Sequence, residues 1–241
     1  MNQSDSWIRG AGAVFFDLVG TLIRARRPIG EQYAAVARRH GAGQADALGL
    51  EQAFRQEFRA AGAIPVQAGS AADIARAERE WWVGLVRRII ARAGLGDDLG
   101  GRRFDAFFDE LYRHFTTADA WSAYPDAGPA LERVRARGLR VGLVTNYDTR
   151  VYAVLNALGL SSALDSVTIP AVAGAAKPDR RIFAKALGTH GLPADAVVHV
   201  GDSMVDDYEG ASAAGLVAIL LDRPDAHGAA SIRRIVSLDE L

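Results

Sequence analysis

The sequence predicts an α/β fold in which a parallel sheet is interrupted, after its first strand, by a block of helices. Three observations predict it. Short apolar runs rich in β-branched residues recur along the chain, and helical patterns alternate with the later runs. A long stretch after the first run carries helical patterns only. Because a helix between two strands acts as a crossover connection, the strands that it joins are expected to be parallel.

Five apolar runs are the predicted strands of this sheet. Each run is nearly continuous in apolar residues instead of alternating with polar ones, which is typical of strands buried on both faces. The runs comprise residues 13–16, 141–145, 167–169, 197–200 and 217–221.

Helical patterns fill the intervals between the later runs. Each pattern ends next to a glycine, which is the residue that most readily adopts the left-handed conformation at the end of a helix. The predicted helices comprise residues 127–137, 149–158, 180–190 and 206–214, and the glycines are Gly138, Gly159, Gly191 and Gly215.

The stretch after the first strand predicts an inserted helical domain. Its four helical patterns cover residues 31–40, 50–61, 71–93 and 104–115. We therefore expect a core domain built from residues 1–26 and 118–241, and a helical domain of residues 27–117. A chain of 241 residues is long enough for both.

Composition excludes several classes of function. The 28 basic and 29 acidic residues nearly balance, so no net field favours nucleic acid or a membrane as a partner. The absence of cysteine excludes disulfides, thiolate catalysis and cysteine-bound zinc. No run has the length of a signal peptide or a membrane span, so we expect a cytoplasmic protein with a small-molecule substrate. The oligomeric state is not predicted.

Polar residues that could carry chemistry follow four of the predicted strands. Asp17 ends the first strand and Thr145 the second, while Lys177 follows the third and Asp202 the fourth. In a parallel α/β sheet, ligands bind beyond the carboxyl ends of the strands. We therefore expect these four side chains to meet in one site. His199, inside the fourth strand, is expected to be a core histidine and not a base.

The four side chains suit a displacement reaction at phosphorus or carbon. Asp17 would attack and form a covalent aspartyl intermediate, which splits one difficult step into two. Thr145 would donate a hydrogen bond to the transferring group, and Lys177 would neutralise the nucleophile and the developing charge. Asp202, together with Asp17, would supply hard oxygen ligands to Mg²⁺.

These segments resemble the four motifs of the haloacid dehalogenase superfamily. FFDLVGTL matches the first motif, VTN the second, AKPD the third, and GDSMVDD followed by GASAAG the fourth. The resemblance implies a three-layer Rossmann-like core with an inserted α-helical cap. Its members are mostly Mg²⁺-dependent phosphatases, with a minority of dehalogenases. RPIGEQYAAVARRHG and LEQAFRQEF also resemble one subgroup of the superfamily.

The resemblance assigns roles to individual positions. It implies catalytic roles for Asp17, Thr145 and Lys177, substrate contacts for Thr21, Asn146 and Arg55, and Mg²⁺ binding by Asp17, the carbonyl of Val19, Asp202 and Asp207. Within GDSMVDD, the spacing to Gly210 favours Asp207 over Asp206 as the motif residue, with a role in orienting Lys177 or a metal-bound water. Asn146 is equally compatible with supporting the motif loop.

One position departs from the motif of the phosphatases. Their second aspartate, two residues after the nucleophile, protonates the leaving group and then activates water, and here that position is Val19. General acid–base help is worth about 10²–10⁴-fold in rate. An alkoxide leaving group would suffer this loss in full. Acyl phosphates, aryl phosphates and halides would suffer less, because they leave without a proton.

Three hypotheses remain open on the sequence alone. GDSMVDD favours a Mg²⁺-dependent phosphohydrolase that acts on a small phosphorylated metabolite, with weakened acid–base catalysis. Val19 and Arg55 are compatible with hydrolysis of a carbon–halogen bond in a 2-haloacid, although dehalogenases carry Ser and Asn in place of Gly201-Asp202-Ser203. The third hypothesis is a non-catalytic binding protein, since the resembled subgroup also lacks the second aspartate.

Overall fold

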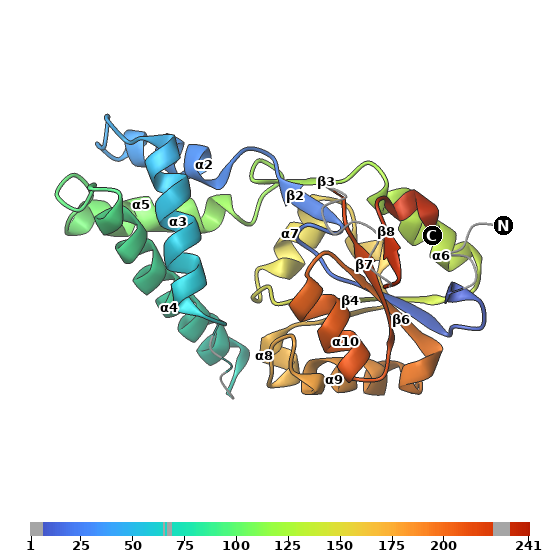
Figure 1. The fold of residues 1–241 in the computed structure, drawn as a ribbon. Helices are drawn as coiled ribbons and strands as arrows, with labels where there is room; N and C mark the ends of the chain where they lie inside the picture. Colours follow the sequence, from blue (N-terminus) through green and yellow to red (C-terminus); the bar gives the residue numbers. More distant parts are fainter. Residues whose placement is uncertain (1–6, 65, 67–68, 224–231) are drawn as a thin grey trace. The chain divides into compact units, whose positions relative to one another are not determined.

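The chain consists of two compact units. The computed structural model describes residues 7–64, 66, 69–223 and 232–241. The core unit contains Met1–Arg24, Ala123–Thr149 and Gly159–Leu241, and the helical unit contains Ala25–Ser122 and Arg150–Leu158 (Figure 1). The domain boundaries expected from the sequence, at residues 27 and 117, stay a prediction beside these units.

A six-stranded sheet forms the centre of the core unit. Its strand order is β5-β4-β1-β6-β7-β8, and the neighbouring strands pair in parallel. The strands are β1 (Ala13–Phe16), β4 (Arg140–Val144), β5 (Ser166–Thr168), β6 (Val197–Gly201), β7 (Val217–Leu221) and β8 (Arg234–Ile235). Phe16, the last residue of β1, pairs with Leu143 and Val200. The residue that follows β1 is therefore placed between the carboxyl ends of β4 and β6.

Helices flank this sheet (Figure 1), so the predicted α/β Rossmann-like fold is confirmed. The described helices of the core unit are α6 (Ala127–Ala136), α8 (Pro170–Ala173), α9 (Arg180–His190) and α10 (Gly210–Ala213), with the π-helix η3 (Met204–Glu209) and the 3₁₀ turns η1 (Ser161–Ala163), η2 (Ala194–Ala196) and η4 (Leu238–Glu240). Helix α9 packs against β4 and β5, and α10 packs against β7. Phe15, Ile182 and Phe183 lie in the apolar layer that joins the sheet to α9.

A short two-stranded sheet lies where the chain passes between the units. It pairs β2 (Ile23–Ala25) with β3 (Trp121–Ala123). Neither strand of this sheet, nor β8, was predicted from the sequence, because a pattern of apolar residues cannot be recognised in two or three residues. The five predicted strands are all present, with β1 and β7 at the predicted bounds and the others shifted by one residue at one or both ends.

Helices form most of the helical unit that the structure describes. They are α2 (Ile29–Arg39), α3 (Ala47–Ala61), α4 (Ala71–Arg92), α5 (Arg102–His114) and α7 (Val151–Ala157). Asp46 caps α3 by accepting bonds from two backbone amides, and Ser70 with Asp73 forms a capping box at the start of α4. Phenylalanines on α5 and leucine and isoleucine on α4 supply much of the buried apolar surface.

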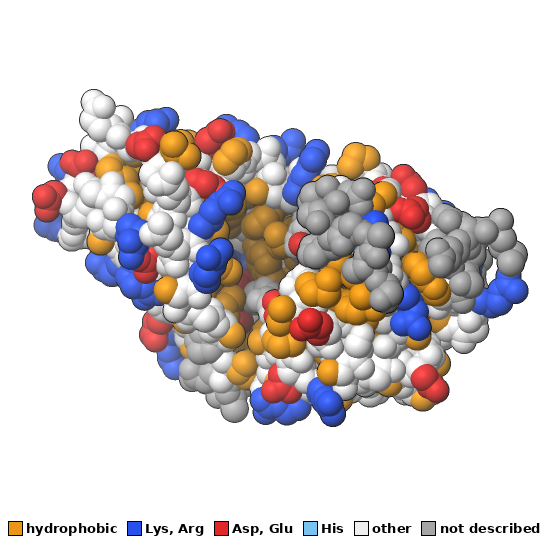
Figure 2. Space-filling model, viewed as in Figure 1, with side chains coloured by type: hydrophobic (Ala, Val, Ile, Leu, Met, Phe, Trp, Pro, Cys, Tyr) orange, Lys and Arg blue, Asp and Glu red, His pale blue; other side chains and the backbone are white. Residues whose placement is uncertain are grey.

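The surface of the helical unit mixes charges of both signs. On the face drawn in Figure 2, basic and acidic side chains are interspersed and form no single basic patch. Glu57, for example, pairs with both Arg88 and Arg92, at 3.1 and 2.5 Å. Within residues 7–64, 66, 69–223 and 232–241, no helix combines the length and the apolar character needed to cross a membrane.

Candidate active site

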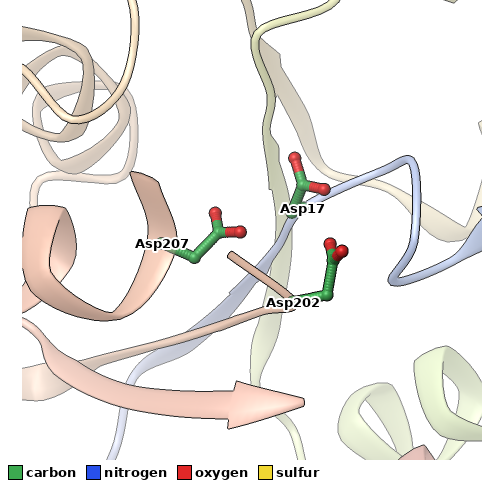
Figure 3. Close-up of side chains that lie close together, drawn as sticks. All are labelled: Asp17, Asp202 and Asp207. Atoms are coloured by element: carbon green, nitrogen blue, oxygen red, sulfur yellow. The ribbon is translucent and has the colours of Figure 1, made fainter. Parts of the chain in front are cut away.

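Three carboxylates from different segments meet beyond the carboxyl end of the sheet. Asp17 directly follows β1, Asp202 follows β6, and Asp207 belongs to η3. Figure 3 shows the three side chains turned toward one another, and one oxygen of each lies within 4.8 Å of the others. The order of the strands explains this convergence, because β6 is the neighbour of β1 in the sheet. The sequence separates Asp17 from the other two by more than 180 residues.

Lys177 joins two of these carboxylates. Its Nζ donates to Asp17 Oδ1 at 2.6 Å and to Asp207 Oδ1 at 2.5 Å, and the side chain is almost fully buried. Burial alone would lower the pKa of Lys177, but the charges of Asp17 and Asp207 outweigh it and hold this pKa above its ordinary value. The lysine is therefore a fixed positive charge beside the predicted nucleophile.

The three carboxylates of the site carry more negative charge than Lys177 can balance. Desolvation raises the pKa of Asp17, and repulsion from Asp207 adds to it, while Lys177 acts in the opposite direction. Desolvation by the surrounding protein, followed by repulsion from Asp17 and Asp207, raises the pKa of Asp202 to about 7, although its side chain keeps access to solvent. A divalent cation would relieve both effects.

The donor set fits Mg²⁺. Mg²⁺ prefers hard oxygen ligands and is usually held by one or two carboxylates, with waters and substrate completing the coordination. Asp17 and Asp202 provide such ligands. Asp207 is already engaged, because Oδ1 accepts from Lys177 and His199, and Oδ2 accepts from the Ser203 amide at 3.0 Å. Its contacts support the predicted role in orienting Lys177. Direct metal binding by Asp207, or by the Val19 carbonyl, stays a prediction.

The loop after Asp17 holds Asp202 in place. Thr21 Oγ1 donates to Asp202 Oδ1 at 3.2 Å, and Thr21 itself is fully buried. Gly20 has a φ of +94°, and a Cβ atom there would collide with the Asp202 carboxylate. The structure thus gives Thr21 a contact with Asp202, while the predicted contact with substrate stays a prediction.

The side chain of Asn146, in the second motif, is hydrogen-bonded to the backbone of Lys177. Asn146 Nδ2 donates to the Lys177 carbonyl at 3.0 Å, and its Oδ1 accepts from the Lys177 amide at 2.7 Å. Asn146 therefore supports the loop that carries the lysine. The buried Thr145 accepts from the Tyr147 amide at 3.4 Å, which occupies a lone pair of the hydroxyl and leaves its hydrogen available for donation.

Two further side chains touch this arrangement. His199, expected to be a core histidine, is fully buried, and its Nε2 lies 2.9 Å from Asp207 Oδ1. Arg223 Nη2 donates to the Thr21 carbonyl at 2.8 Å. Neither the hydrogen bond of Arg223 to the Thr21 carbonyl nor that of His199 to Asp207 was predicted from the sequence. A polar residue inside an otherwise apolar strand was the signal that pointed to His199.

Arg55 lies on α3 of the helical unit. Its Nε contacts Glu51 Oε1 at 2.9 Å, one helical turn away, and the side chain is mostly exposed. This is the geometry of an ordinary surface ion pair. A role for Arg55 in binding substrate or halide stays a prediction.

Comparisons with known proteins agree with this geometry. The family model for haloacid dehalogenase-like hydrolases matches residues 11–215. Haloacid dehalogenase-like hydrolase domain-containing protein 3 of Mus musculus is 35% identical over 206 residues, which are 86% of this chain and 80% of the mouse protein. The resemblance stated from the motifs is thereby confirmed.

Solved structures of both enzyme classes share the fold. The crystal structure of the HAD phosphatase from Thermococcus onnurineus is 25% identical, with a TM-score of 0.58 over 95% of this chain and 94% of that one. The 2-haloacid dehalogenase from Pseudomonas syringae pv. Tomato DC3000 is 26% identical, with a TM-score of 0.64 over 95% of this chain and 96% of that one. Similarity alone therefore does not separate the two chemistries.

Proposed function

The chain belongs to the haloacid dehalogenase-like hydrolases, and we propose that it is a Mg²⁺-dependent phosphohydrolase acting on a small phosphorylated metabolite. The observation that carries the proposal is the group of Asp17, Asp202 and Asp207 around Lys177. A carboxylate assisted by a lysine can displace a halide from carbon without a metal ion. The additional, solvent-accessible carboxylate of Asp202 would be a ligand of a metal ion. Such an ion would stabilise the negative charge of a phosphoryl group.

The first step forms an aspartyl phosphate. A carboxylate oxygen of Asp17 attacks phosphorus, and the bond from phosphorus to the leaving oxygen breaks with its electron pair. Lys177 neutralises the attacking carboxylate, and the Thr145 hydroxyl donates to a phosphoryl oxygen. Asp17 and Asp202 would hold Mg²⁺, which would supply positive charge to balance the charge of the phosphoryl group.

The second step returns Asp17 to its free form. Water attacks phosphorus, the bond between phosphorus and the Asp17 oxygen breaks, and inorganic phosphate is released. The attacking water passes its proton to bulk solvent, because Val19 has no group that can accept it. We therefore expect this step to be slow compared with the first one for substrates with good leaving groups.

Val19 also limits the range of substrates. It cannot protonate a departing alkoxide, so the proposed substrates are acyl phosphates or phosphates of acidic hydroxyls, whose leaving groups depart as stable anions. In the same proposal the helical unit is the cap that selects the substrate, and Arg55 contributes to binding it. The reaction takes place in the cytoplasm, without nucleic acid or membrane as a partner.

Dehalogenation is the second candidate. The absence of an acid–base group at Val19 suits a halide, which leaves without a proton, and the solved structures with this fold include a 2-haloacid dehalogenase. Asp202 counts against it, since halide displacement leaves this carboxylate without a task. Chloride release from 2-chloropropionate, with no requirement for Mg²⁺, would favour this candidate over the phosphohydrolase.

The decisive experiment measures phosphate release from acetyl phosphate and from p-nitrophenyl phosphate in the presence of Mg²⁺. We expect turnover in the wild type, and we expect Asp17→Asn and treatment with EDTA each to abolish it. Asp195→Asn, far along the chain in η2, is the matched control and should leave the rate unchanged. Turnover that survives Asp17→Asn would remove Asp17 as the nucleophile. No turnover with either substrate would contradict the proposal and would leave halide release and non-catalytic binding to be tested.

A further inference from the structure

Among the described residues, the side chain of His199 makes one hydrogen bond. Its partner, Asp207, belongs to the candidate active site. The residue lies in β6 between Val198 and Val200, and its side chain has no exposed surface. Its Nε2 lies 2.9 Å from Asp207 Oδ1. Its Nδ1 is buried and has no hydrogen-bond partner among the residues that the structure describes.

A histidine at this place is unfavourable for packing alone. The ring of Phe183 lies against the imidazole, with 5.2 Å between the ring centroids, so the environment is apolar. A buried polar atom without a partner costs about 1–3 kcal/mol. An apolar side chain would fill the same space without that cost. What the imidazole adds is the bond to Asp207.

The proton in this bond belongs to His199. The Asp207 carboxylate already accepts from the Lys177 ammonium at Oδ1 and from the Ser203 amide at Oδ2, so both of its oxygens act as acceptors. Nε2 must then carry the hydrogen. Asp207 Oδ1 therefore accepts two hydrogen bonds. One comes from the imidazole of His199 in the sheet, and the other comes from the ammonium group of Lys177.

We propose that His199 is a positioning residue of this site, whose Nε2–H fixes the Asp207 carboxylate so that its Oδ1 holds Lys177 against Asp17. The proposal rests on the proposed function for its effect on turnover, but the hydrogen bond itself can be observed without any substrate. Ser203 anchors the other oxygen of Asp207 through its backbone amide at 3.0 Å. With both oxygens anchored, the carboxylate cannot rotate away from Lys177.

The first test uses the wild-type protein and nuclear magnetic resonance. We expect the ¹⁵N shift of His199 Nε2 to fall in the range of a protonated ring nitrogen, and that of Nδ1 in the range of an unprotonated one. We also expect a Lys177 ammonium signal that exchanges slowly with water, because the group is buried and bonded twice. The opposite tautomer, with the proton on Nδ1, would overturn the proposal, since His199 could not then donate to Asp207.

The second test removes the donor. His199→Met is expected to lower kcat for acetyl phosphate by about 10–100-fold, the usual effect of losing a group that orients a ligand residue. KM should change by less than about two-fold, because substrate binding itself is untouched. His199→Gln, whose amide can reach the same place with an N–H, is expected to recover most of the loss and to restore the Lys177 signal. An equal loss in both variants would show that only packing matters.

A second buried histidine provides the matched control. His190 also packs on a core phenylalanine, Phe15, at 5.2 Å between ring centroids, but its Nε2 bonds to Ser166 and not to the site. His190→Met is expected to lower the melting temperature while leaving kcat and the Lys177 signal unchanged. A kcat loss in His190→Met equal to that in His199→Met would overturn the proposal.

The two proposals can fail separately. If the wild type turns over no phosphate but shows the Nε2 proton and a slowly exchanging Lys177, the phosphohydrolase is contradicted and the role of His199 in the Asp207–Lys177 pair is supported. If the wild type turns over phosphate normally and His199→Met keeps the same turnover and the same Lys177 signal, the phosphohydrolase is supported and the role of His199 is contradicted. If His199→Met does not fold, the tautomer and the Lys177 signal in wild type and in His199→Gln still decide.

Discussion

The side chain of Val19 is 40% exposed, although it lies only two residues from the buried carboxylate of Asp17. It contributes little to the core, so a polar residue can replace it without opening a cavity. The position thus offers a direct way to test whether missing proton transfer limits the proposed reaction.

Val19→Asp is expected to raise the rate of phosphate release from an alkyl phosphate such as glycerol 3-phosphate by about 10²-fold, because an acid would then be available to protonate the alkoxide. The gain with acetyl phosphate should be much smaller in the step that forms the aspartyl phosphate. Single-turnover release of the leaving group from both substrates measures the ratio in this step. Val19→Asn has nearly the same shape as Val19→Asp but no carboxyl that could act as acid or base, and equal gains in the two variants would contradict the explanation.

At the scale of single residues, the meeting of Asp17, Lys177 and Asp202 could be predicted because the ends of strands can be recognised in the sequence, while their catalytic roles stay predictions. Asp17, Thr145, Lys177 and Asp202 each follow an apolar run, and a parallel sheet brings such ends together. The bond between His199 and Asp207 could not be predicted in this way. It depends on the turn of η3, which returns Asp207 to the side of β6 from which the chain has just emerged.

Elements differ in how well their bounds could be predicted. Helices such as α3 and α4 have caps and a buried stripe, so their ends were placed within a few residues. The predicted helix 206–214 is instead the π-helix η3 followed by α10. Gly210, the first residue of α10, lies against Pro178 with too little room for a side chain to be added freely. Such a tertiary contact leaves no periodic signal in the sequence.

The loop between β1 and β2 is the element on which the metal site depends most directly. Gly20→Ala is expected to lower the free energy of unfolding by about 1–3 kcal/mol, because φ is +94° there. It should also weaken Mg²⁺ binding, because the new Cβ would displace the Asp202 carboxylate. Denaturant unfolding and calorimetric titration with Mg²⁺ measure the two effects.

Gly159→Ala separates backbone strain from this collision. Gly159 also has a positive φ, +70°, but a Cβ atom there would have no neighbour within 4 Å. We expect a similar loss of stability and unchanged Mg²⁺ binding. Equal Mg²⁺ affinities in Gly20→Ala and Gly159→Ala would mean that Gly20 does not position Asp202.

On the scale of the whole chain, contacts between distant segments hold the core unit together. Asp126, at the start of α6, accepts two bonds from Arg223 at 2.9 and 3.0 Å. It also accepts from the Ser237 hydroxyl and the Leu238 amide, both at 2.9 Å. These partners lie 97 to 112 residues away in the chain. This network could not be predicted from the sequence, because a lone aspartate and a lone arginine have no pattern that pairs them.

The Asp126 network predicts a specific pH dependence of stability. Burial alone would raise the pKa of Asp126, but the bonds from Arg223, Leu238 and Ser237 outweigh it and lower the pKa below the ordinary value of 3.8. A carboxyl whose pKa is lower in the folded state stabilises the fold above its unfolded pKa. This contribution is lost as the pH falls through the folded pKa. The protein should therefore lose stability below about pH 4 in part through this residue.

Asp126→Asn is expected to lower the free energy of unfolding at pH 7 by about 1–3 kcal/mol, since it replaces a charged acceptor of four bonds by a neutral amide that faces donors. The difference from wild type should shrink as the pH falls below 4, because the carboxyl of the unfolded wild type takes up a proton there before that of the folded protein does. Urea unfolding at pH 7, 5 and 3.5 measures it. Asp105→Asn, an exposed residue of the helical unit paired with Arg87 at 3.8 Å, is the control and should have little effect at any pH. A difference for Asp126→Asn that stays constant from pH 7 to 3.5 would show that its charge does not hold these segments together.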